Sequence, residues 1–167
     1  ENGAPEYPIA GQLKISDFFA IHGYRVVSSK RREATAKTEL LCRTLFGECS
    51  RYSDSLRTLN YLAGGAEKTL FARNDVPEKS WELLKLFQDQ GAIRYYDDKK
   101  IKFADEDGRL FCRGFWLEDW VGSELRELNR RVKLQDYASS IVIESGSNTS
   151  NEIDAAFLYN NRLYLIE

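Results

Sequence analysis

The sequence predicts an α+β fold, and three observations lead to that class. Apolar residues recur at helical spacing between residues 33 and 91. A strand–turn–strand pattern follows at residues 93–103, and a second one ends the chain at residues 153–167. A longer amphipathic pattern at residues 115–131 separates them and predicts another helix.

Residues 1–32 are expected to be a lead-in or the tail of a preceding domain. Prolines and glycines make residues 1–12 irregular. A short helix is expected to open at Ile15, and residues 24–27 form a candidate strand. Residues 28–32 are polar and basic, which is typical of a linker.

Three helices are expected in residues 33–107, and each ends at a glycine. Ser53 or Asp54 can cap the second helix, and Pro77 is suited to the first turn of the third. The apolar residues at helical spacing are Leu40, Leu41, Leu45 and Phe46, then Leu56, Leu59, Tyr61 and Leu62, then Trp81, Leu83, Leu84, Leu86 and Phe87.

A hairpin follows the three helices, with residues 93–96 and 101–103 on either side of a polar turn. Three helices and a hairpin are the outline of a winged helix. Lys99 and Lys100 in the turn are candidate contacts to nucleic acid, as are Arg130 and Arg131 at the end of the later helix. Short basic runs are more often simply solvated, so both readings stay open.

The last part of the chain, residues 108–167, is expected to hold the long helix and then strands. Residues 141–143 form one strand, and residues 145–151 form a turn-rich loop. Two further strands flank Asn160 and Asn161, a pair that tolerates the positive φ values of a tight hairpin turn.

A two-residue turn at this asparagine pair places Asp154 opposite Glu167 on the two strands. Residues in that relation have Cβ atoms ~5 Å apart, where two like charges repel. The strands are apolar on both faces, so we expect helices to cover the sheet and bury the pair. Two buried carboxylates this close favour a bridging divalent cation, while an exposed, frayed strand end would leave them solvated.

The chain also resembles a known family in these residues. Asn-Glu-Ile-Asp at residues 151–154, the apolar strand, and Asn-Asn-Arg-Leu-Tyr-Leu-Ile-Glu at residues 160–167 resemble the core of the PD-(D/E)XK nuclease superfamily. They more closely resemble CRISPR ancillary nucleases activated by cyclic oligoadenylate. Those proteins join an N-terminal CARF sensor, a winged-helix middle and a C-terminal nuclease. Gly-Phe-Trp-Leu-Glu at residues 114–118 resembles the opening of their nuclease domain.

The resemblance implies a set of roles. Asp154 and Glu167 would bind Mg²⁺ or Mn²⁺, and Glu118 would be the acidic residue of the first nuclease helix. Residues 1–32 would be a lead-in or the tail of the preceding sensor domain, residues 33–107 the winged-helix-like domain, and residues 108–167 the N-terminal half of a restriction-endonuclease-like domain. DNA or RNA would be the substrate, and a cyclic oligoadenylate would act through a sensor domain outside this chain. A homodimer in the cytoplasm is also implied.

The family pattern continues with a lysine two positions after the final glutamate, beyond the end of this sequence. The sequence also contains no methionine, so we expect an internal fragment of a longer protein. Glu118 near a helix start is equally explained by the helix dipole. Glu152, on the same side of its strand as Asp154, is either an outer ligand or a solvated strand end.

Composition narrows the remaining function classes. The net charge of −2 provides no global positive field toward nucleic acid, so contact with phosphates requires a local patch or a bound cation. Cys42, Cys49 and Cys112 are scattered and the chain has one histidine, which argues against zinc and fits a reducing cytoplasm. No apolar run approaches the ~20 residues of a membrane span.

Two other hypotheses compete with a nuclease. One is a non-catalytic nucleic-acid-binding or dimerisation module built on the winged helix. The other is an inactive nuclease fold kept as a scaffold. The residues that follow Glu167 in the gene would discriminate, because a lysine two positions on supports the nuclease.

Overall fold

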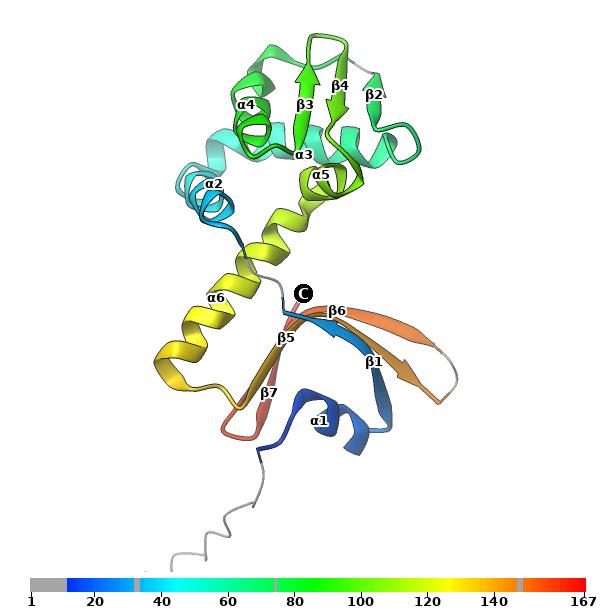
Figure 1. Cartoon of the computed structure of the whole chain (residues 1–167), viewed down its shortest axis with the longest axis vertical. Helices are drawn as coiled ribbons and strands as arrows, with labels where there is room; N and C mark the ends of the chain where they lie inside the picture. The colour runs from blue at the N-terminus through cyan, green and yellow to red at the C-terminus, as the bar shows by residue number, and fades with distance from the viewer. Residues whose placement is uncertain (1–11, 32–33, 74, 147–148) are drawn as a thin grey trace, which may run out of the picture. The chain divides into compact units, whose positions relative to one another are not determined.

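The computed structural model describes residues 12–31, 34–73, 75–146 and 149–167. The chain divides into two compact units. We call Glu33–Ser123 the middle unit, and Glu1–Arg32 together with Glu124–Glu167 the sheet unit. Both units combine helices with an antiparallel sheet, so the predicted α+β class is confirmed (Figure 1).

The three helices expected in the middle unit are present: α2 (Ala36–Gly47), α3 (Cys49–Gly65) and α4 (Trp81–Asp89). Thr35 caps α2 by accepting a hydrogen bond from the Thr38 backbone N–H at 3.2 Å. The expected cap of the second helix at Ser53 or Asp54 is wrong. Helical hydrogen bonding already begins at the Glu48 carbonyl, which accepts from the backbone of Arg51 and Tyr52.

A 3-10 turn, Glu78–Ser80, lies between Pro77 and α4. Pro77 therefore precedes the helix instead of occupying its first turn. It is extended, with ψ of 134°, and its carbonyl accepts from the Ser80 N–H at 2.8 Å.

The expected hairpin is confirmed as β3 (Ile93–Tyr96) and β4 (Lys100–Phe103). A short strand that the sequence did not reveal, β2 (Phe71–Arg73), pairs with the other edge of β4. The three strands form an antiparallel sheet in the order β2-β4-β3. Strand β2 has only three residues, too few for an alternation pattern to stand out in the sequence.

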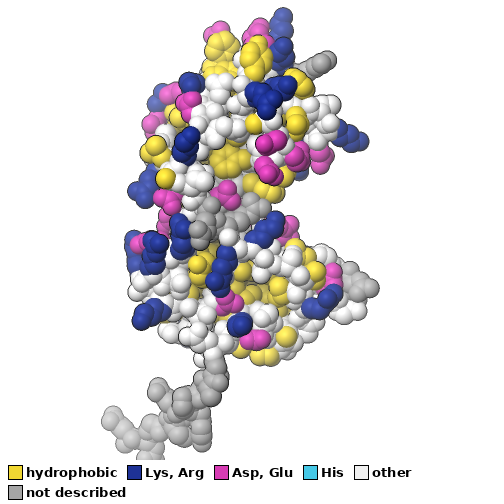
Figure 2. All heavy atoms as spheres, viewed as in Figure 1, with side chains coloured by type: hydrophobic (Ala, Val, Ile, Leu, Met, Phe, Trp, Pro, Cys, Tyr) yellow, Lys and Arg dark blue, Asp and Glu magenta, His cyan; other side chains and the backbone are white. Residues whose placement is uncertain are grey.

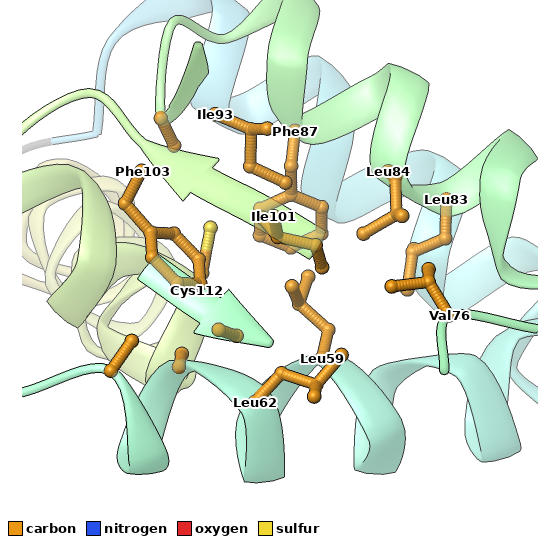
Figure 3. Packing of buried hydrophobic residues seen from close by; sticks show 14 of the residues in the cluster. Leu59, Leu62, Val76, Leu83, Leu84, Phe87, Ile93, Ile101, Phe103 and Cys112 are labelled. Carbon is orange, nitrogen blue, oxygen red and sulfur yellow. The ribbon is translucent and has the colours of Figure 1, made fainter. Parts of the chain in front are cut away.

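The core of the middle unit lies between this sheet and the helices (Figure 3). Ile101 and Phe103 point from β4 toward Leu59 of α3 and Phe87 of α4, and all four are at most 1% exposed. Burying each such side chain stabilises the fold by about 1.5–3 kcal/mol. The helical periodicity of the sequence thus identified real core positions.

The middle unit extends beyond the boundary expected after residue 107. Helix α5 (Glu106–Leu110), a π-helix (Phe111–Phe115) and the first part of α6 (Trp116–Val132) belong to it. Cys112 is buried in the same core, and the buried Arg109 side chain donates to the Ala63 carbonyl at 2.9 Å. Gly114 has φ of 132°, which lets the chain turn from the π-helix into α6.

The sheet unit contains β1 (Tyr24–Lys30), β5 (Asp136–Ser145), β6 (Ser150–Tyr159) and β7 (Arg162–Ile166). They pair antiparallel in the order β1-β5-β6-β7. Residues 12–31 are thus more than the expected lead-in, because β1 is the strand next to β5. Ser28 and Lys30, expected in a linker, pair with Val142 and Ser139.

Helix α1 (Ile15–Ile21) packs on one face of this sheet (Figure 1). Its buried side chains Ile15 and Phe19 join the core formed by β5 and β6, with Ile141 and Leu158 at 0% exposed. The irregular stretch expected over residues 1–12 lies, except for Gln12, outside the described residues. In the described part of the chain, every helix falls short of the length and apolarity that a membrane span requires.

Candidate metal centre

The hairpin that carries the candidate carboxylates has the expected register. Asn160 and Asn161 have φ values of 50° and 58°, which is the backbone conformation anticipated for a tight turn. The side chain of Gln135 fixes this turn, since its Oε1 accepts from the Asn161 N–H at 2.6 Å. From Tyr159 opposite Arg162, the pairing continues without slippage to Ala155 opposite Ile166.

Asp154 and Glu167 are the next residues on either side of that last pair. Continuing the register by one position puts them opposite each other, with Glu167 directly after the end of β7. Paired residues of an antiparallel ladder point to the same face. The register therefore favours two carboxylates on one face at the end of the hairpin.

Strand β5, which neighbours β6, bends at the position opposite Asp154. Ser139 pairs with Ala155 and Ile141 pairs with Ile153, so Ser140 is the residue that corresponds to Asp154. Ser140 has φ of 47°, which interrupts the regular alternation of strand β5. On β6, Ile153 and Ala155 are both buried while Asp154 between them is exposed.

The expected burial of the carboxylate pair is wrong. Asp154 and Glu167 are both exposed, and so are Tyr164 and Leu165 of β7, at 40% and 52%. Among the described residues, β7 pairs with β6 alone, so its side chains have a neighbouring strand on one side. In solution the two charges are hydrated, so their repulsion by itself does not demand a cation.

The donor set nevertheless fits a hard divalent cation. Mg²⁺ is commonly held by one or two carboxylates and keeps several water ligands, an arrangement that an exposed pair permits. Within the described residues, no cluster of three or more histidine, cysteine or acidic side chains is placed to hold a metal ion. A closed, all-protein metal cage is therefore not the kind of site this hairpin offers.

The third predicted acidic residue, Glu118, lies in the first turn of α6 and is partly buried. It belongs to the middle unit, whereas Asp154 and Glu167 belong to the sheet unit. Glu152, the possible outer ligand, is exposed on β6 opposite Val142. Its exposure fits the alternative of a solvated strand residue.

Two other acidic residues of the sheet unit already have basic partners, which the sequence did not reveal. Glu144 accepts from Arg25 at 2.6 Å, and Asp136 accepts from Arg31 at 3.1 Å. Arg31 also stacks over the Tyr137 ring at 4.8 Å. Arg31, in the middle of the basic run at residues 30–32, therefore already has partners within the sheet unit.

The predicted nucleic-acid contacts fall into two groups. Arg130 and Arg131 both pair with Glu127, at 3.4 and 3.1 Å, and these guanidinium groups lower the pKa of Glu127. Lys99 is exposed in the β3–β4 turn, and the Lys100 ammonium lies 3.9 Å from Asp97. On the face drawn in Figure 2, basic and acidic side chains are interspersed, as the near-zero net charge suggests.

Two of the three cysteines are buried, as the sequence suggests, whereas Cys49 is exposed. All three are free thiols, and Cys42 and Cys112 are buried. Burial raises the pKa of the Cys42 thiol to about 12 and raises that of Cys112 as well. Both are therefore protonated, apolar core groups and poor metal ligands.

Comparison with known proteins gives a fold and no family. No protein-family model matches the sequence, and no curated protein is detectably similar to it. The structure is similar to that of Can2 from Sulfobacillus thermosulfidooxidans in complex with cyclic tetra-adenylate, with a TM-score of 0.73 and 22% identity over 91% of this chain. It is also similar to protein VC1899 from Vibrio cholerae, with a TM-score of 0.69 and 24% identity over 92% of this chain. The chain spans 40% and 42% of the lengths of these two proteins.

Proposed function

We propose that this chain is part of a metal-dependent endonuclease that hydrolyses phosphodiester bonds in DNA or RNA. The observation that carries the proposal is the register of the β6–β7 hairpin, which leads to Asp154 and Glu167 opposite each other. The same two residues are the metal ligands that the resemblance to PD-(D/E)XK nucleases implies. The fold is similar to that of Can2, which supports a protein of the same general kind.

In the proposed site, the carboxylates of Asp154 and Glu167 hold Mg²⁺ or Mn²⁺. A divalent cation, when bound, supplies Lewis acidity toward water and toward phosphoryl oxygens. The exposure of both side chains leaves room for water ligands and for a phosphate of the substrate. Glu118 remains a candidate for a supporting acidic role on the basis of the resemblance.

We further propose how this activity is regulated. Can2 was determined in complex with cyclic tetra-adenylate, which supports a cyclic oligoadenylate as the activator here. The sensor domain that binds it would lie outside this chain, in a dimeric, cytoplasmic CRISPR-linked defence protein. In this proposal, the winged-helix-like part comprises helices α2, α3 and α4 with the β2-β4-β3 sheet, and the nuclease part includes β5, β6 and β7.

The alternative is a winged-helix module that binds nucleic acid or dimerises without cleaving. The observation that favours it is the exposure of Asp154 and Glu167, because two exposed carboxylates do not require a cation between them. Metal-dependent turnover separates the two candidates, because only the nuclease requires it.

The test is a cleavage assay on the longer protein that contains this chain, with plasmid DNA and with RNA, in the presence of Mn²⁺ and cyclic tetra-adenylate. Asp154→Asn should lower cleavage by orders of magnitude, because it removes a charge that holds the cation. Glu144→Gln is the matched control, since it removes one carboxylate from the same sheet and breaks only an exposed ion pair. Cleavage that survives in Asp154→Asn would refute the site.

A further inference from the structure

The outward face of the three-stranded sheet in the middle unit carries alternating aromatic and basic side chains. Ile101 and Phe103 of β4 are fully buried in the core, so Lys100 and Lys102, which alternate with them, point to the opposite face. Lys102 is paired with Phe71 on β2 and with Tyr95 on β3. The Phe71 ring, the Lys102 ammonium group and the Tyr95 ring therefore lie in one row across the three strands.

Both lysines lie against these rings. The Lys102 ammonium is 5.0 Å from the centroid of the Phe71 ring, and the Lys100 ammonium is 5.3 Å from the centroid of the Tyr95 ring. Tyr95 is 45% exposed, and the Lys100 side chain is also 45% exposed. Two rings and two cations thus meet solvent on one sheet face.

We propose that this face binds single-stranded nucleic acid, with bases stacked on Phe71 and Tyr95 and phosphates paired with Lys100 and Lys102. The proposal rests on the proposed nuclease function, because it names the form in which the substrate strand is held. Aromatic side chains stack on any base, and flanking cations track the backbone.

The geometry favours a single strand over a duplex. The rings lie on strands β2 and β3 on either side of β4, roughly 9.5 Å apart at twice the usual strand spacing. A ring on a sheet surface reaches the face of a base only where that base is unstacked, which a duplex prevents. Each lysine is flexible enough to move from its ring to a phosphate as a base takes its place.

Asp97 accepts a hydrogen bond from the Tyr95 hydroxyl at the edge of this surface. The Tyr95 hydroxyl donates to the Asp97 carboxylate at 2.5 Å, and this bond with the backbone N–H groups of Lys99 and Lys100 lowers the pKa of Asp97. The carboxylate therefore stays ionised and repels phosphate from the hairpin turn. Phosphate therefore meets Lys102 directly on the body of the sheet, whereas Lys100, with its ammonium 3.9 Å from Asp97, exchanges that exposed ion pair for a phosphate.

The test is fluorescence anisotropy of the whole 167-residue chain with a short fluorescein-labelled oligonucleotide of mixed sequence, as a single strand and as a duplex. EDTA is included so that binding is read without cleavage. The double variant Lys100→Gln/Lys102→Gln should bind the single strand about tenfold more weakly. It should also lower the slope of log affinity against log salt by about 1.4, because two phosphate contacts are lost.

The matched control is Lys79→Gln/Lys85→Gln, which changes the charge equally in the same unit. These two lysines lie outside the sheet and pair with Asp54 and Asp89, as Lys100 pairs with Asp97, so both double variants also break an exposed ion pair. This control should bind like the unmodified chain. Equal weakening in both double variants would overturn the proposal, as would a chain that does not bind single strands.

The role of the ring is tested separately. Tyr95→Leu should weaken binding about tenfold through lost stacking. Tyr95→Phe keeps the ring, loses only the bond to Asp97, and should bind normally. Equal binding by these two variants, or a preference for duplex, would overturn the proposal. None of these readouts depends on Asp154, so failure here and failure of the cleavage site are distinguishable.

Discussion

The rings of Phe157 and Tyr164 lie stacked across strands β6 and β7, with centroids 4.7 Å apart and planes inclined by 6°. The two residues are also a Cα pair of the antiparallel ladder. Their contact thus reports the same register that leads to Asp154 and Glu167. Whatever weakens this stack should loosen the end of the hairpin on which the proposed site lies.

The first prediction concerns this stack. Phe157→Ala and Tyr164→Ala should each destabilise the chain, and the double variant should lose less than the sum of the two. A cross-strand aromatic pair contributes about 0.5–1 kcal/mol of coupling. Urea unfolding of the four proteins measures that coupling as a double-mutant cycle. Strictly additive losses would show that the rings do not stabilise the register.

The second prediction concerns the turn. Asn160 has φ of 50°, a left-handed conformation that most L-residues adopt only at a cost. Asn160→Ala should therefore lower the free energy of unfolding by about 1 kcal/mol. Asn160→Gly, which has no Cβ, should stay close to the unmodified chain. Equal destabilisation by alanine and glycine would mean that the asparagine side chain, and not the backbone angle, stabilises the turn.

These local features explain why so much of the hairpin could be predicted from the sequence. The Asn160–Asn161 turn and its flanking apolar strands are contiguous, so turn geometry alone sets every pair up to Ala155 and Ile166. Helices α2, α3 and α4 were likewise predictable from the spacing of residues such as Leu59 and Phe87, which are buried in the core.

What the sequence did not reveal depends on contacts between distant segments. Tyr24 pairs with Ser145, so β1 belongs to a sheet whose other strands lie near the opposite end of the chain. The exposure of Asp154 accompanies the bend at Ser140, and that of Glu167 accompanies the position of β7 at the edge of the described sheet. Neither the position of a strand at the edge of a sheet nor a single residue with a positive φ produces a periodic pattern of apolar residues in the sequence. The predicted burial of the carboxylates failed for this reason.

The third prediction concerns the pH dependence of folding stability in the middle unit. The Arg109 side chain, 1% exposed, donates two hydrogen bonds to Glu106 and lowers the pKa of that carboxyl from its ordinary value of 4.5. The stabilising contribution is therefore complete above pH 4.5 and is lost as the pH falls through the lowered folded-state pKa.

Glu106→Gln should accordingly be less stable than the unmodified chain at neutral pH, and the difference should shrink in acid. Denaturant midpoints of both proteins across this pH range measure the effect. Glu82→Gln is a useful comparison, because it removes an exposed carboxylate that pairs with the exposed Arg51 in the same unit. A gap between Glu106→Gln and the unmodified chain that is constant with pH would rule out the ionised pair as its cause.

The last prediction separates a metal-binding role of Asp154 from a structural one. Mn²⁺ should raise the melting temperature of the unmodified chain, because a ligand bound only by the folded state adds about 2.7 kcal/mol at 100 times its dissociation constant. Asp154→Asn should lose this response, since it removes half of the charge that attracts the cation. Without metal the variant should melt no lower than the unmodified chain, because losing one of two neighbouring carboxylates relieves repulsion. Glu144→Gln should keep the full response to Mn²⁺, since its partner is Arg25 and it lies outside the proposed pair. A lower melting temperature of Asp154→Asn in EDTA would instead assign Asp154 a role in the fold, and an unmodified chain indifferent to both Mn²⁺ and Mg²⁺ would contradict the proposed centre.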